Sequence, residues 1–439
     1  MKFKKYVILL TEAIKQAMLS PFYGFIQGHA HLSTKDIDYI ESLLPNESSS
    51  IISEFEESFA EIVGNGQAIS YASARMGFYV LMKVLGITSG DEILFTAATC
   101  STMINAALRI GATPVYADID PNTFGSNPYD IEKKITHKTK IIVAQHSFGI
   151  PCDITAIKKI SVLKNIFLLE DCALTLGSRV NGITVGNFGD AALFSTDHSK
   201  PINTMLGGLI YTCNHLLYKK LFSYNSSCQK LSLDKKRAIW SQILLEKRLC
   251  NPRKYGSLEL IDILRLFGRK ISGTLSPFLD EDFSPIPLSS YPYPSKMPTF
   301  LAALGLIELK RWEQISANRI YFLKKFLKYL KRNNLIEIFP NCYNNSQIEI
   351  VPLRIAWSPP KGDLFRKSIS HYIQTSRIWF LKPIVPTTIP LEKFHYKKGS
   401  CPLSEKFGLN MVNLPCNLNE NEFNNLLTLF LKNIKPISG

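Results

Sequence analysis

The sequence has 439 residues, 46% of them hydrophobic and 20% charged, so it can bury a large core and fold as one large and one smaller unit. Nine cysteines, an odd number without a Cys-x-x-Cys pair, argue against a disulfide framework or a zinc site, so we expect a cytoplasmic protein without a metal. The formal charge of +15 would suit nucleic acid, but no nucleic-acid module or arginine-rich arm is recognisable, so we expect no nucleic-acid partner.

The N-terminal extension, residues 1–33, begins with a helical pattern whose apolar residues fall on one face. A basic start followed by five apolar residues is too short for a signal peptide, whose apolar core needs roughly 7–15 residues. No run in the chain approaches the length of a membrane span. We expect the apolar face to pack against the body of the protein, with shallow contact to a membrane surface as the alternative. The face consists of Leu10, Ala13, Ile14, Ala17 and Met18.

Residues 34–214 alternate between helical and strand patterns. Helical periodicity fills much of the stretch 34–64 and returns at 76–85 and 154–163, and short apolar runs of strand length lie between the later helices. This alternation predicts an α/β fold with a doubly wound, mostly parallel sheet. The clearest strands are Lys140–Gln145, Ile166–Leu169, Ala191–Phe194 and Gly208–Thr212.

Two features of this region could bind or contact a ligand. Ala72 and Ser73 lie at the start of the helix at 76–85, where backbone N–H groups can close on a phosphate, although the same residues suit an ordinary helix N-cap. His146 follows a buried-type strand. We expect this histidine either to contact a substrate or to be a hydrogen-bonded histidine at a strand end.

Polar side chains follow two neighbouring apolar runs. Asp171 ends one run, Ser195 ends the next, and Lys200 follows five residues later. Ligands of open parallel sheets bind beyond the carboxyl ends of the strands, so these groups would surround one crevice. An acid, a hydroxyl and a lysine are what a pyridoxal 5'-phosphate (PLP) site needs: an amine for the Schiff base, a partner for the ring nitrogen and a phosphate ligand. By itself the spacing also fits a strand-ending acid and a solvated loop lysine.

Residues 215–295 form a basic insert and linker. The stretch 215–272 carries thirteen lysines and arginines but only four acids, and Ser276–Pro294 is rich in proline and serine. A solvated surface is the default for lysines on helical faces. Residues 296–439 predict a connecting helix towards Leu330 and then a small domain of short strands and helices.

The central stretch resembles the DegT/DnrJ/EryC1/StrS family of PLP-dependent sugar aminotransferases, whose pattern is roughly EDAAQ…G…G-x-x-G-D…FSF…K. The resemblance covers most of Thr34–Leu431 outside the basic insert and includes Gly90–Phe95, Gly111–Pro121 and Asn413–Pro415. The central motif stands as Glu170-Asp171-Cys172-Ala173-Leu174, Gly186-Asn187-Phe188-Gly189-Asp190, Phe194-Ser195-Thr196 and Lys200.

The resemblance implies a fold-type I aminotransferase with a large PLP domain and a small α+β C-terminal domain. It implies that Lys200 is the Schiff-base lysine, Asp171 the partner of the ring nitrogen, and Ser195 a phosphate ligand together with the turn at Ala72 and Ser73. Cys100 falls where the family often carries an aromatic residue stacked on the PLP ring. The family also implies a homodimer in which each phosphate site receives a residue from the partner subunit.

Three departures from the family pattern change contacts around this site. Leu174 replaces a glutamine near the cofactor, and Leu206 replaces the acid of G-E-G-G. Pro294 replaces the asparagine that reaches the partner's phosphate, and Lys296 replaces an arginine beside it. We therefore expect Lys296 to supply the charge that reaches across.

The resulting hypothesis is a PLP-dependent aminotransferase that moves an amino group, from a donor such as glutamate, to a nucleotide-linked keto sugar for surface polysaccharide or secondary-metabolite sugars. His146 and His198 are candidate substrate-side groups. One alternative is a sugar dehydratase, but those relatives carry histidine in place of Lys200. The other is a catalytically silent relative that binds a partner through the basic insert.

Overall fold

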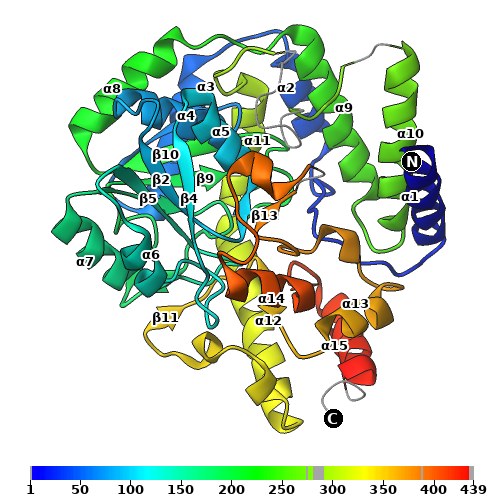
Figure 1. Ribbon diagram of the computed structural model, residues 1–439. Helices are drawn as coiled ribbons and strands as arrows, with labels where there is room; N and C mark the ends of the chain where they lie inside the picture. Colours follow the sequence, from blue (N-terminus) through cyan, green and yellow to red (C-terminus); the bar gives the residue numbers. More distant parts are fainter. Residues whose placement is uncertain (1, 273–274, 280–290, 387–388, 435–439) are drawn as a thin grey trace.

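The computed structural model describes residues 2–272, 275–279, 291–386 and 389–434. Its centre is a seven-stranded sheet with the strand order β1-β10-β9-β6-β5-β2-β4 (Figure 1). Strand β10 alone runs against the others, which confirms the predicted α/β fold with a mostly parallel sheet. The strands are β1 (Gln67–Tyr71), β2 (Glu92–Thr96), β4 (Thr113–Ala117), β5 (Thr139–Gln145), β6 (Phe167–Asp171), β9 (Ala191–Ser195) and β10 (Gly208–Thr212).

Successive side chains of the central strands pack alternately into two different hydrophobic cores. In β5, Ile141 and Val143 enter the larger core, which also contains side chains of α4 and α5, whereas Ile142 and Ala144 enter a smaller core with α7. This is the period-two pattern of a sheet covered on both faces. The helices of the large domain are α2 (Thr34–Ser42), α3 (Ser49–Val63), α4 (Ala74–Val84), α5 (Ser101–Ile110), α6 (Pro128–Lys134), α7 (Ile154–Lys164) and α11 (Thr299–Lys310).

The helix ends follow from local sequence. Asp153 caps α7 by accepting the N–H of Ala156, and Asn127 precedes the Pro128 that opens α6. Helix α5 ends at Gly111, which has a φ of +87° and returns the chain to β4. These short connections leave the carboxyl ends of the parallel strands at one edge of the sheet.

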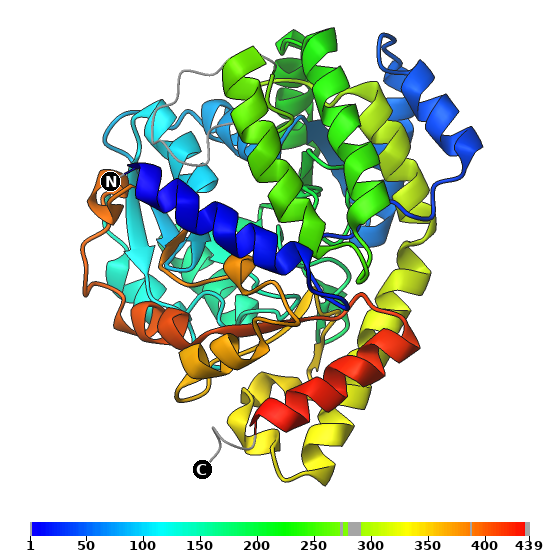
Figure 2. The ribbon, with the colours of Figure 1, turned by 90° about the vertical axis from the view of Figure 1, so that its right-hand side faces the viewer.

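The N-terminal helix α1 (Lys2–Ala17) packs on α10 (Gly256–Ser272), as Figure 2 shows. A Cβ atom at Gly256 would lie 1.9 Å from the carbonyl oxygen of Gln16, so the two segments touch at backbone level. The helix therefore packs against the body, but the predicted face does so only in part: Ala13 is 2% exposed, whereas Ile14 and Met18 are 46% and 80% exposed. Among the described residues, no helix is long and apolar enough to cross a membrane.

The basic insert is helical: α8 (His215–Ser227), α9 (Leu233–Leu249) and α10. The expectation that its lysines are solvated is wrong for Lys235 and Lys236, which are 3% and 5% exposed. Lys235 donates to the carbonyl oxygens of Ser276 and Phe278, and Lys236 pairs with Glu47. The predicted boundary after residue 214 falls between β10 and α8, although α8 packs against β1 and α4. Residues 280–290 of the predicted linker lie outside the described residues.

The C-terminal part has its own aromatic core, in which Phe339, Trp357 and Phe430 are in ring contact. Strands β12 (Arg354–Trp357) and β14 (Val412–Pro415) pair antiparallel, and helices α12 (Trp312–Arg332), α13 (Gly362–Ile369), α14 (Pro402–Asn410) and α15 (Glu420–Ile434) complete it. The remaining short strands are β3 (Thr99–Cys100), β7 (Arg179–Val180), β8 (Ile183–Thr184), β11 (Ile348–Glu349) and β13 (Ile384–Val385).

Candidate active site

The strand register brings the predicted residues to one edge of the sheet. Gly208, the first residue of β10, pairs with Tyr71 on one side and with Ser195 on the other. On the next strand, Asp171 pairs with Leu193, two residues before Ser195. Neighbouring strands are about 4.8 Å apart, so the turn after Tyr71, the Ser195 hydroxyl and the Asp171 carboxylate lie along one short stretch of this edge.

Lys200 lies on the loop between β9 and β10. Its Nζ lies 5.8 Å from the centre of the Trp379 ring, and among the described residues its ammonium makes no hydrogen bond or ion pair. Asp171 is 5% exposed, and its Oδ1 accepts the N–H of Ala173. Burial raises the pKa of Asp171, although the Ala173 N–H and the Lys200 charge oppose the rise. Lys200 and Asp171 are thus close enough to interact electrostatically.

The start of α4 has the features of an anion site. Ser73 occupies the N-cap position, but its side chain makes no capping bond, and its Oγ is buried with no partner among the described residues. A Cβ atom at Gly208 would lie 2.4 Å from the backbone nitrogen of Ala74, so glycine lets the first turn of α4 approach the sheet. The first N–H groups of a helix and an unpaired hydroxyl suit a phosphate, although the Ala72 N–H in this turn donates to the Ser295 carbonyl oxygen at 3.0 Å. With the unpaired Lys200 amine, they fit a cofactor that carries a phosphate and an aldehyde.

His146 does not face this site. It is fully buried, its Nδ1 accepts the N–H of Cys152 at 3.1 Å, and its Nε2 lies 3.1 Å from Glu170. The proton therefore sits on Nε2, and no ring nitrogen remains for a substrate. This corrects the substrate-contact hypothesis for His146 in favour of the structural alternative.

Glu170 organises the loop that follows β6. Its buried carboxylate accepts the backbone N–H groups of Gly186, Phe188 and Gly189 at 2.6–2.8 Å, besides the Nε2 proton of His146. Glu170 and Asp171 point in different directions, because successive residues of a strand point to opposite faces of the sheet. Glu170 holds the scaffold and Asp171 faces the crevice.

His198 points into the basic insert. Its Nδ1 donates to Glu246 Oε1 at 2.9 Å, and its ring packs edge-on against Phe278. Burial lowers the pKa of His198, but the Asp197 and Glu246 carboxylates outweigh burial, so the pKa is raised. The Nδ1 of His198 thus has a protein partner, and a substrate contact of this residue stays a prediction.

The departures from the family pattern have simple structural outcomes. Leu174 and Leu206 are each 5% exposed, so apolar packing replaces the polar groups. Cys100 lies at the N-cap of α5, at the same edge of the sheet. Lys296 forms a backbone bridge with Tyr71, and its Nζ donates to the carbonyl oxygen of Ser226 at 2.7 Å within the same chain. Its reach to a partner subunit stays a prediction.

Residues from distant segments were missed by the sequence analysis. Trp379 covers Lys200, and the backbone N–H of Trp379 donates to Asn413 Oδ1 at 2.9 Å. Arg377 lies 3.8 Å from Asp262 of α10, and Glu246 comes from α9. No local pattern marks these residues, because the C-terminal part and the insert meet only in the folded chain.

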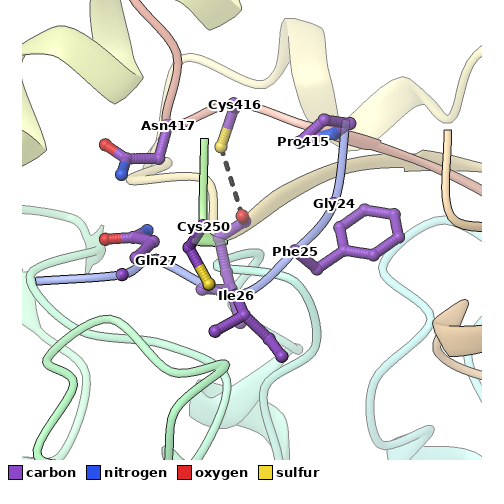
Figure 3. A pocket seen from close by; sticks show the side chains of 10 residues that line it. Gly24, Phe25, Ile26, Gln27, Cys250, Pro415, Cys416 and Asn417 are labelled. Carbon is purple, nitrogen blue, oxygen red and sulfur yellow. Dashed lines mark hydrogen bonds between the residues drawn. The ribbon is translucent and has the colours of Figure 1, made fainter. Parts of the chain in front are cut away.

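A small pocket lies between the N-terminal segment, the end of α9 and the C-terminal part (Figure 3). The backbone of Gly24–Gly28 forms one wall, and Cys416, which donates to the carbonyl oxygen of Leu353 at 3.2 Å, lies opposite. None of the residues predicted from the sequence lines this pocket.

Two clusters of three possible metal ligands occur among the described residues. In the first, His146, Glu170 and Cys172 are fully enclosed, and backbone donors occupy the carboxylate. In the second, His29 and His31 share Glu308, whose pKa they lower to about 2 against the effect of burial. Arg311 donates to Nδ1 of His31 there, and its positive charge opposes a cation. Neither arrangement indicates a metal centre.

Comparisons with known proteins agree with the resemblance. The model of the DegT/DnrJ/EryC1/StrS aminotransferase family matches residues 35–425. GDP-perosamine synthase of Escherichia coli O157:H7 is 34% identical over 197 residues, which cover 44% of this chain and 54% of that protein. The spore coat polysaccharide biosynthesis protein SpsC of Bacillus subtilis is 34% identical over 170 residues, which cover 39% and 44%. The match thus spans about half the length of these relatives.

Solved structures show the same fold. An aminotransferase from Psychrobacter cryohalolentis has a TM-score of 0.69 at 21% identity. The match covers 93% of this chain and 98% of the chain of that aminotransferase. PseC of Helicobacter pylori, an aminotransferase of pseudoaminic acid biosynthesis, has a TM-score of 0.69 at 20% identity and covers 94% and 100%.

Glu170→Gln tests the scaffold role of this carboxylate. The amide removes a buried charge that four donors satisfy and turns an N–H group towards backbone donors, so the free energy of unfolding should fall by about 2–3 kcal/mol. Urea unfolding measures the change, with the exposed Glu61→Gln as the matched control. Equal unfolding midpoints for Glu170→Gln and the wild type would contradict the assignment.

Proposed function

The chain belongs to the DegT/DnrJ/EryC1/StrS aminotransferase family, and on this basis we propose that it is a PLP-dependent aminotransferase acting on a nucleotide-linked keto sugar. The observation that carries the proposal is the meeting of three groups at one sheet edge: the unpaired Lys200 amine, the Asp171 carboxylate and the unpaired Ser73 hydroxyl at the start of α4. The names of the relatives, a GDP-perosamine synthase and a spore coat polysaccharide protein, support a sugar substrate and polysaccharide synthesis.

Each residue has a distinct task in this reaction. When bound, PLP supplies an aldehyde that captures amines and a ring that withdraws electrons. Lys200 Nζ would hold the aldehyde carbon and, once released, carry a proton between the cofactor carbon and the substrate carbon. Asp171 would keep the ring nitrogen protonated. Ser73, the turn at Ala72 and Ser195 would hold the phosphate, with Cys100 near the ring face.

The donor and the compartment are part of the proposal. Glutamate is the proposed amino donor, by analogy with other members of the family. A cytoplasmic location is supported by the cysteines, all nine of which are free thiols.

Lys200→Ala tests the central assignment. In the wild type, borohydride should fix PLP on Lys200, which mass spectrometry of the derived peptide detects. The variant should lose this adduct and all amino transfer while keeping the wild-type unfolding temperature, because the amine has no protein partner among the described residues. The exposed Lys140→Ala should behave as the wild type. An adduct that persists in Lys200→Ala would sink the assignment, and a wild type that stays colourless with PLP would favour the silent relative.

Asp171→Asn tests the ring-nitrogen partner. The amide cannot stabilise a positive charge on the ring, so PLP should remain bound while the single-turnover reaction with glutamate slows about 10²–10³-fold. The absorbance change on adding glutamate measures this rate, and the exposed Asp38→Asn is the control. An unchanged rate would mean that another acid faces the ring.

We also propose a homodimer with active sites at the interface. The Tyr291–Ala303 stretch lies where the family contributes to the neighbouring phosphate, and Lys296 would leave the carbonyl oxygen of Ser226 to make that contact. Lys296→Ala should then raise the PLP dissociation constant about tenfold without dissociating the dimer, a loss of about 1.4 kcal/mol.

Sedimentation and PLP titration measure these two properties, with the exposed Lys230→Ala as the control from the same region. A monomer that turns over substrate would refute the dimer. A dimer with unchanged PLP affinity in Lys296→Ala would refute only the role of this lysine.

A further inference from the structure

A row of hydrogen-bonded side chains runs from α10 through α9 to the loop that carries Lys200. Gln242 Nε2 donates to Asp262 Oδ1 at 3.2 Å and to Glu246 Oε1 at 3.3 Å. Glu246 Oε1 then accepts the Nδ1 proton of His198 at 2.9 Å. Because Gln242 and Glu246 are fully buried and His198 is 9% exposed, this row belongs to the interior of the protein.

Glu246 depends strongly on His198. A buried carboxylate is costly unless it is paired and hydrogen-bonded. Oε1 receives His198 and Gln242, whereas Oε2 has no partner among the described residues. The imidazole and the Gln242 amide thus supply the hydrogen bonds to Glu246, with the Arg377 guanidinium as a further positive charge nearby, and the carboxylate in turn fixes the position of the ring.

His198 lies two residues before Lys200. It makes a hydrogen bond to a carboxylate outside the loop, that of Glu246 on α9. Among the described residues, Lys200 itself is held by its backbone N–H, which donates to the Asp197 carbonyl oxygen at 3.0 Å, and by the Trp379 ring. On the other side of Lys200, the Ile202 side chain is 1% exposed in the larger core, and Asn203 Nδ2 donates to the carbonyl oxygen of Gln27. Lys200 thus lies between two anchored stretches, and the bond of His198 to Glu246 is the anchor on its N-terminal side.

We propose that Glu246 is a positioning residue for Lys200: through His198 it holds the lysine loop against α9. The basic insert thereby becomes part of the active site. The inference rests on the proposed function, since it takes Lys200 as the PLP lysine. Its structural half, the hold of α9 on the loop, is measurable without cofactor.

Glu246→Gln and His198→Leu test the proposal on cofactor-free protein. Hydrogen–deuterium exchange of a peptide that covers residues 196–202 should accelerate about tenfold or more in both variants, because each loses the charged bond. His198→Asn supplies a side-chain N–H near the position of Nδ1 and should restore slow exchange. In the loaded protein, the PLP dissociation constant should rise severalfold in the first two variants and return towards wild type in the third.

Lys236→Met is the matched control. It removes the ion pair of the buried Lys236 with the exposed Glu47 from the same helix, ten residues or about 15 Å from Glu246 along α9. It should lower the unfolding temperature but leave loop exchange and PLP affinity unchanged.

Two results would overturn the proposal: wild-type loop exchange in both Glu246→Gln and His198→Leu, or equal acceleration in Lys236→Met. If Glu246→Gln does not fold, His198→Leu alone decides. If the wild type binds no PLP, the proposed function fails, while the exchange measurement still decides whether α9 holds the loop.

Discussion

The candidate site depends on the hydrogen bonds that the buried carboxylate of Glu170 accepts. A full charge in the interior is tolerable only when donors surround it, and here three backbone N–H groups and His146 do so. These donors come from the end of β5 and from the loop that leads to β9. One side chain therefore ties together the segments next to Asp171 and Ser195. The Lys200 amine and the Ser73 hydroxyl, which have no hydrogen-bond partner among the described residues, thus lie beside a scaffold that is fully bonded.

The parts of the site that lie close in sequence were predictable. Apolar runs that end in Asp171 and Ser195 predict neighbouring strand ends, and the register of β6 with β9 places them together. The turn at Ser73 joins this edge through Gly208, and its small residues were visible in the sequence. In each case a pattern of a few residues fixes both the local structure and the direction in which the chain emerges from the sheet.

The parts that depend on distant segments were not predictable. His146 precedes a loop that could have opened onto a ligand, and only the fold shows that the N–H of Cys152 occupies its Nδ1. Trp379 reaches Lys200 from the C-terminal part, which no spacing along the chain encodes. Glu246 was hidden for another reason: it lies in a segment whose average charge is strongly basic, and an average does not report which side chains face inwards.

The charge of the insert follows from where its few acids lie. Glu246 bonds His198, Asp262 accepts from Gln242, and Glu259 accepts from Gln374 of the C-terminal part at 3.0 Å. Three of the four acids in residues 215–272 thus make inward contacts, while nine of the eleven basic residues whose side chains the structure describes are exposed or partly exposed. The described outer surface of this segment is positive because most of its carboxylates bind other parts of the chain and do not face solvent. Helices α9 and α10 act as a brace between the lysine loop, the N-terminal helix and the C-terminal part, and their basic composition is a consequence of that position.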